Sequence, residues 1–283
     1  MNAHLFIIDP QNDFCKQGEA PVFDQFWRVT NADKASGTLS IPGADKDMDR
    51  LADMIKGNLR QIRTITTTLD SHNDIHIAQP VFTVDSNGNH PNPFTLIENA
   101  DVKSGKYRGS RPEWTMILDE YTAKLEATGK YKLCVWAPHC LIGTKGHAVV
   151  DSLNSAFREW SSQRGLNINY ITKGSNPFTE HYGAVQAEVT RDDDTTTKLN
   201  SNLIKLLQNT GSDDILIAGE ALSHCVATTI RQVAAEFTPD QIKKFVLLED
   251  ACSNVPGFEK YGEEFVVEMK AKGMRTSTTK QYF

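Results

Sequence analysis

The chain has 283 residues, enough for one large α/β domain or two small ones, and its 39% hydrophobic and 23% charged residues are ordinary for a soluble globular protein. A net charge of −6 argues against binding to nucleic acids or to anionic membrane surfaces, and no apolar run approaches the ~20 residues that a membrane span requires. The N-terminus lacks the basic start and the cleavage site of a signal peptide.

The cysteines are five in number and form no CxxC pair: Cys15, Cys134, Cys140, Cys225 and Cys252. An odd and scattered set argues against a disulfide framework and against a cysteine zinc site. It favours a reducing compartment, so we expect a cytoplasmic protein.

Short apolar runs alternate with amphipathic stretches along the chain, the pattern of a parallel sheet with crossover helices. This pattern predicts an α/β fold with a mostly parallel six-stranded sheet. The predicted strands are Leu5–Asp9, Arg63–Asp70, Lys132–Trp136, Asn167–Lys173, Ile215–Ala218 and Lys244–Ala251.

Helices are predicted where apolar residues recur at helical spacing or where capping residues occur. Their ranges are Ala44–Gln61, Pro112–Ala127, Ala148–Gln163, Asn200–Gln208, a helix that begins near Cys225 and ends near Phe237, and Glu259–Lys272. Asn200 is expected to cap its helix and Gly211 to end it. Residues 80–110 are rich in Asn, Pro, Gly and Ser, so we expect an irregular excursion there.

Most of the predicted strands end at an ionisable or aromatic residue. In open α/β sheets, ligands bind beyond the carboxyl ends of the strands. The residues expected at that edge are Asp9, Asp70, Trp136, Lys173, Ala221 and Asp250.

Cys225 is a candidate nucleophile because it stands at the mouth of a predicted helix, just beyond a predicted strand. Peptide dipoles at a helix N-terminus lower a thiol pKa, and backbone N–H groups there can bind an oxyanion. Asp9 could take the thiol proton and Lys173 could hold thiolate and carboxylate in place. The alternative is a buried structural cysteine, since cysteines are among the most buried residues.

A second candidate site is a metal centre. Asp70 and His72 are two residues apart on extended backbone, so their side chains point the same way, and His139 follows another predicted strand. One carboxylate and two imidazoles with open positions suit zinc or iron. A DxH pair alone is a weak signal.

Five segments in one order along nearly the whole chain resemble the isochorismatase-like cysteine hydrolases, and among them the nicotinamidases (pyrazinamidases). They are Ile8–Phe14 (IDPQNDF), Thr68–Ile77 (TLDSHNDIHI), Trp136–Gly146 (WAPHCLIGTKG), Lys173–Tyr182 (KGSNPFTEHY) and Gly219–Val226 (GEALSHCV).

This resemblance implies a three-layer α-β-α fold over a single domain, residues 1–283, and assigns roles to particular residues. The implied catalytic triad is Asp9, Lys173 and Cys225. The implied metal ligands are Asp70, His72 and His139, binding zinc, iron or manganese. Phe14 and Trp136 would be walls that contact a substrate ring. The Glu220–Ala221 peptide would be cis, and the N–H groups of Ala221 and Cys225 would form the oxyanion hole.

The implied activity is metal-assisted hydrolysis of nicotinamide or a similar aromatic carboxamide, within NAD salvage and by a homo-oligomer. Two departures limit the carry-over: Ala137-Pro138 replaces the family's Pro-x before His139, and Ser71 and Asn73 replace a tryptophan and a proline. An insertion at about 80–130 is expected to cover the site mouth or an oligomer interface. The alternatives are a metal-free cysteine hydrolase acting on a ureido, carbamoyl or other C–N substrate, and a non-catalytic binding protein of this fold.

Overall fold

The protein, described here by a computed structural model over residues 2–129 and 131–283, is built on a six-stranded sheet in which every strand pair is parallel. The order across the sheet is β10-β9-β8-β1-β2-β7. Their bounds are β1 (Ala3–Ile8), β2 (Ile62–Asp70), β7 (Asn169–Lys173), β8 (Asp214–Gly219), β9 (Phe245–Leu248) and β10 (Arg275–Ser277). The chain builds outward from β1 first on one side and then on the other, which places a topological switch point at β1.

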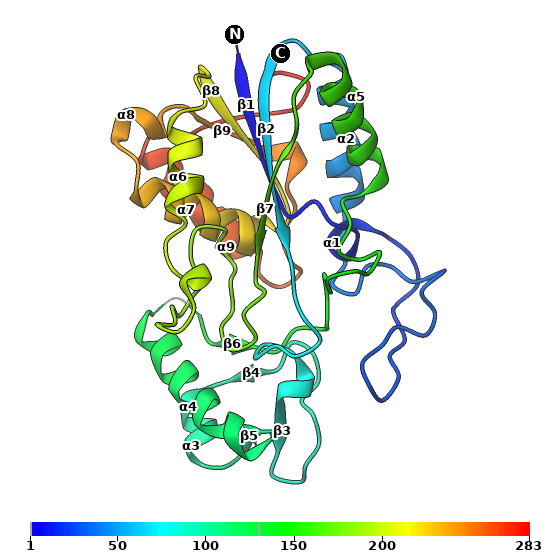
Figure 1. Cartoon of the computed structure of the whole chain (residues 1–283), viewed down its shortest axis with the longest axis vertical. Coiled ribbons are helices and arrows are strands. Elements are labelled where there is room, and N and C mark those ends of the chain that lie inside the picture. Colours follow the sequence, from blue (N-terminus) through cyan, green and yellow to red (C-terminus); the bar gives the residue numbers. More distant parts are fainter. Residues whose placement is uncertain (1, 130) are drawn as a thin grey trace.

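Helices cover both faces of this sheet, so the predicted three-layer fold is confirmed (Figure 1). Side chains of a strand alternate between its faces, and Leu5 and Ile7 of β1 belong to one apolar cluster while Phe6 and Ile8 belong to the other. The first cluster is covered by α2 (Ala44–Gly57) and α5 (Asp151–Arg164). The second is covered by α6 (Ser201–Gln208), α7 (Ala227–Ala235) and α9 (Glu259–Ala271), with the short α8 (Pro239–Ile242) beside them.

The structure confirms one predicted helix cap and corrects two predicted helix ends. The Asn200 side chain accepts a hydrogen bond from the backbone N–H of Leu203 at 3.0 Å, as its predicted capping role requires. Gly211 does not end α6, which stops at Gln208 with Asn209 as its C-cap. α2 is four residues shorter than predicted, because it ends at Gly57.

One of the six predicted strands was assigned to the wrong sheet. Of Lys132–Trp136 only β6 (Leu133–Cys134) is paired, antiparallel to β4 (Leu96–Ile97), away from the central sheet. The sixth central strand is β10, a polar edge strand with no apolar pattern to announce it. Trp136 therefore does not end a central strand. Asp250 does not either, because β9 stops at Leu248 and a 3₁₀ turn follows.

Residues 80–129 contain more regular structure than predicted, because an irregular excursion was expected over residues 80–110; Lys130, like Met1, lies outside the described residues. They contain a 3₁₀ turn (Pro80–Phe82), β3 (Thr83–Asp85), β4, α3 (Asn99–Lys103), β5 (Tyr107–Gly109) and α4 (Pro112–Ala127), whose bounds match the prediction. They pack around an apolar cluster that they share with neighbouring segments and that includes Phe82, Leu118 and Trp136. This segment lies beyond the carboxyl ends of the central strands (Figure 1). Among the described residues, no helix has the length and apolar character needed to cross a membrane.

Candidate active site

Four functional side chains meet because their strands are neighbours in the sheet order β8-β1-β2-β7. Asp9 follows β1, Asp70 ends β2, and Lys173 ends β7. Cys225 lies in a π-helical turn, Leu222–Val226, that follows β8 and leads into α7. All four side chains are buried at the carboxyl edge of the sheet, where the sequence predicted them.

Lys173 is the centre of the cluster. Its Nζ lies 3.0 Å from Asp9 Oδ2, 3.0 Å from Asp70 Oδ1 and 3.7 Å from Cys225 Sγ. It also donates to the backbone carbonyl of His181 at 3.0 Å. Burial alone would lower the pKa of Lys173, but the two carboxylates raise it well above its usual range. The ammonium therefore stays charged.

Asp9 and Cys225 both hold their protons more tightly than free side chains do. Burial raises the pKa of Asp9, although Lys173 and a hydrogen bond from Thr68 Oγ1 at 2.5 Å oppose this. Burial also raises the pKa of Cys225 well above its ordinary value, against the effect of Lys173, and the carboxylate of Asp9 raises it further. The expectation that a helix N-terminus would lower this thiol pKa is wrong, because burial and nearby negative charge outweigh the dipole. Cys225 rests as a thiol with a carboxylate beside it.

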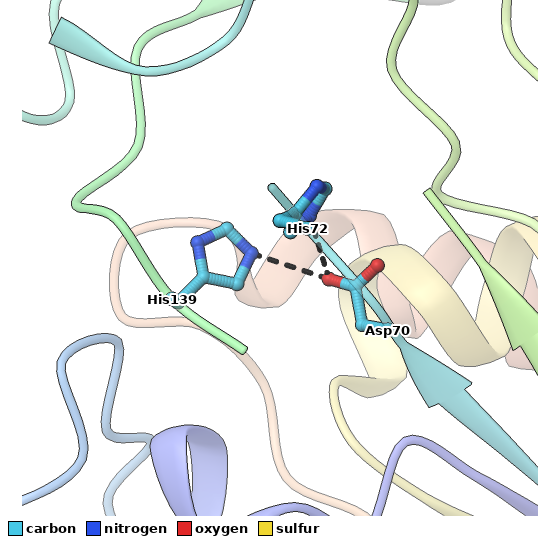
Figure 2. A group of neighbouring side chains, drawn as sticks. All are labelled: Asp70, His72 and His139. Carbon is cyan, nitrogen blue, oxygen red and sulfur yellow. Dashed lines mark hydrogen bonds and ion pairs between the residues drawn. The ribbon is translucent and has the colours of Figure 1, made fainter. Parts of the chain in front are cut away.

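Asp70, His72 and His139 offer three ligand atoms within 4.8 Å of one another. His72 Nε2 lies 3.1 Å and His139 Nε2 lies 3.2 Å from Asp70 Oδ2, and Figure 2 shows both rings aimed at that oxygen. Ligands about 2.1 Å from a tetrahedral zinc ion lie about 3.4 Å apart, so these spacings suit a small divalent metal. The shifted proline before His139 has not displaced its ring.

The hydrogen bonds behind the rings support the same conclusion. His72 Nδ1 lies 3.1 Å from the carbonyl oxygen of Gly174, and His139 Nδ1 lies 2.7 Å from that of Ala137. A carbonyl can only accept, so each Nδ1 carries a proton, and each Nε2 faces Asp70 Oδ2. A neutral imidazole at this point offers its Nε2 lone pair to a cation, and a protonated one donates its Nε2–H to Asp70. The donor set therefore fits a metal ion.

His76, the last histidine of the same segment, is not part of this set. Its Nε2 lies 3.1 Å from the carbonyl oxygen of Thr179, and its Nδ1 accepts from the backbone N–H of Ala78 at 3.3 Å. Both ring nitrogens are therefore used by backbone groups. Burial also holds the pKa of His76 well below its usual range, so the ring is neutral.

A narrow cavity of about 30 Å³ is lined by the candidate nucleophile and by two of the three candidate metal ligands. Its lining includes Cys225, Asp70 and His139 together with both predicted ring walls, Phe14 and Trp136. Ala221 lines it as well, and the Glu220–Ala221 peptide is cis, as the resemblance implies. Small-molecule pockets typically measure about 300–1,000 Å³, so a substrate ring requires these walls to move apart.

Two further residues of this cavity received no role from the sequence. Glu180 is buried, accepts the His181 N–H at 2.8 Å with one carboxylate oxygen, and has no hydrogen-bond partner for the other within the described residues. In the sequence, the indication of a role for Glu180 was its position in the Lys173–Tyr182 segment. His224 directly precedes Cys225 and also lines the cavity. Burial lowers its pKa to about 4, so it is neutral and no resting acid.

Comparison with known proteins finds similarity to nicotinamidases and pyrazinamidases. No family model matches the chain. A nicotinamidase from Schizosaccharomyces pombe is 26% identical over 227 residues, which cover 80% of this chain and 73% of the relative.

Solved structures agree on the fold. The yeast nicotinamidase bound to the inhibitor nicotinaldehyde superposes with a TM-score of 0.61 at 18% identity, covering 98% of this chain and 99% of that one. An Acinetobacter baumanii nicotinamidase gives 0.59 at 19%, covering 99% and 97%. The Pyrococcus horikoshii pyrazinamidase, solved in complex with zinc, gives 0.54 at 18%, covering 98% and 99%. The chain thus has the fold of these nicotinamidases and pyrazinamidases, and its sequence is similar to that of a nicotinamidase.

Proposed function

We propose that this protein is a cysteine amidase that hydrolyses nicotinamide or a similar aromatic carboxamide to the acid and ammonia. The observation that carries the proposal is the junction of Cys225, Asp9 and Lys173 with a metal donor set in one buried cavity. The activity named for the Schizosaccharomyces pombe relative supports the same substrate class.

The reaction uses this chain's own groups in two halves. Asp9 takes the thiol proton, and Cys225 Sγ forms a bond to the amide carbon while the N–H groups of Ala221 and Cys225 stabilise the oxyanion. The C–N bond then breaks, and the proton held by Asp9 leaves with ammonia. Asp9 next takes a proton from water, whose oxygen attacks the thioester and releases the acid and the thiol. Lys173 remains charged throughout and holds Asp9 beside the sulfur.

Asp70, His72 and His139 would hold a divalent metal, zinc by preference and iron or manganese as alternatives. Bound there, the metal would supply a Lewis-acid anchor for the ring nitrogen of the substrate. Phe14 and Trp136 would pack against the two faces of the ring and exclude water from it.

We also propose a cytoplasmic, homo-oligomeric enzyme of pyridine nucleotide salvage, with one domain over residues 1–283 and the 80–130 segment as its insertion. The free and buried state of all five cysteines supports a reducing compartment.

The test is ammonia release over a panel of amides, run together with metal quantification on the purified protein. We expect nicotinamide to be hydrolysed, one metal ion to be bound per chain, and a chelator to remove metal and activity together. Restored activity on adding zinc completes the test. Hydrolysis of ureido or carbamoyl substrates without bound metal would contradict the proposal.

A further inference from the structure

A second and larger cavity adjoins the one at the nucleophile. It measures about 430 Å³, compared with about 30 Å³ beside Cys225, and falls within the range of about 300–1,000 Å³ typical of small-molecule sites. We call it the aromatic cavity after the rings that line it: Tyr131, Trp136, Tyr182, His224, Phe258 and Tyr261.

Three rings form the partition between the two cavities, because Trp136, Tyr182 and His224 line both. Trp136 Nε1 donates to the Tyr182 hydroxyl at 3.0 Å, and the His224 ring centroid lies 5.5 Å and 5.6 Å from those of the other two rings. His224 directly precedes Cys225 in the chain. A shift of this partition therefore opens the aromatic cavity toward the nucleophile.

Several polar atoms of these rings already have hydrogen-bond partners. The Tyr131 hydroxyl lies 3.0 Å from Thr228 Oγ1, and the Tyr182 hydroxyl is held by Trp136. Burial lowers the pKa of His224 to about 4, so its ring carries no charge near neutral pH. At the rim, Lys132 is paired with Glu98. Glu126 also lines the cavity, and its carboxylate accepts the backbone N–H of Asn99 at 2.6 Å. Rings make up most of the remaining lining, so the aromatic cavity presents mainly ring faces and edges to an occupant.

We propose that the aromatic cavity binds a second, uncharged planar ring of the substrate, so that amides with two rings are preferred over single-ring amides. This inference rests on the proposed amidase function and specifies its substrate class. The specificity residue to examine is Tyr261 of α9, which lines the aromatic cavity and not the cavity of Cys225.

The experiment compares kcat/KM for nicotinamide with that for phenyl-substituted nicotinamides, one for each free ring position and one for the amide nitrogen. We expect at least one two-ring amide to exceed nicotinamide. Tyr261→Ala should lower kcat/KM for that amide about fivefold, the loss of one aromatic contact, while nicotinamide changes less than about twofold. Tyr170→Ala is the matched control, because Tyr170 is an exposed tyrosine of β7 that lines neither cavity.

Binding without turnover separates this inference from the proposed function. The Cys225→Ala protein is titrated with the phenyl-substituted amides by calorimetry, and adding Tyr261→Ala should weaken the tightest of them about fivefold. No two-ring preference in either assay, or an equal effect of Tyr261→Ala on nicotinamide, overturns the inference. If no amide is hydrolysed and the two-ring amides still bind through Tyr261, the proposed function fails and the aromatic site stands.

Discussion

Replacing Lys173 by methionine should destabilise the protein strongly at neutral pH. The substitution keeps the length of the side chain and removes the ammonium that lies 3.0 Å from both Asp9 and Asp70. Breaking a buried ion pair from one side leaves an uncompensated charge, which costs about 3–5 kcal/mol. Since about 1 kcal/mol shifts Tm by about 2–4 °C in a protein of this size class, we expect a fall of roughly 6–20 °C.

The pH dependence of this deficit is a sharper test than its size. Burial already raises the pKa of Asp9 above its ordinary value, and loss of Lys173 raises it further. A carboxyl whose folded pKa is raised contributes stability below its unfolded pKa and loses that contribution as pH rises. The deficit of Lys173→Met should therefore be largest near pH 7 and shrink as pH falls toward about 4.

Urea unfolding of the wild type and the variant between pH 4 and 8 measures this deficit. Lys260→Met is the control, because its ammonium is exposed and lies 3.6 Å from Glu264, a surface pair worth about 0–1 kcal/mol. A variant that loses less than about 1 kcal/mol at pH 7, or whose deficit grows as pH falls, would refute the view that Lys173 neutralises the buried carboxylates.

Three further outcomes are expected. Cys225→Ala should reduce ammonia release by at least about a thousandfold while metal content stays at the wild-type level, and retained turnover would remove Cys225 as the nucleophile. Asp13→Asn should weaken zinc binding about 10- to 100-fold in a competition titration, because Asp13 Oδ2 accepts the Cys140 N–H at 2.7 Å beside the ligand His139; unchanged affinity would contradict this support. The kcat/KM profile should fall as pH drops through the raised pKa of Asp9, since the base must be ionised, and a limb at the ordinary pKa of a free aspartate, about 3.9, would show that burial does not act on it.

Two of the central strands could be predicted because burial on both faces makes their residues apolar. β1 and β8 are buried over their whole length, so each reads as a continuous apolar run. The alignment of Asp70 with His72 also followed from the two-residue period of extended backbone. β10 could not be found in this way, because Arg275, Thr276 and Ser277 lie at the sheet edge and bury little apolar surface.

The same reasoning could not predict properties that depend on residues far away in the sequence. The thiol pKa of Cys225 was expected to fall by its helix position, but it is set by burial and by Asp9, 216 residues earlier in the chain. The apolar run at Lys132–Trp136 packs into the cluster of the 80–130 segment, a choice that hydrophobic pattern alone leaves open. Glu180 and His224 enter the cavity through loop and turn geometry, which has no periodic signature.

Lys173 couples the two parts of the site, the carboxylate beside Cys225 and the candidate metal ligands. The ammonium of Lys173 lies 3.0 Å from Asp9, the carboxylate beside the sulfur, and 3.0 Å from Asp70, the carboxylate among the candidate metal ligands. The charge state of either carboxylate therefore affects the other through this ammonium. Loading the metal set and protonating Asp9 are therefore linked equilibria, and each shifts the other by the same free energy. Exchanging the metal to change ring recognition will therefore also change the pKa of Asp9, and the pH optimum should move with the metal.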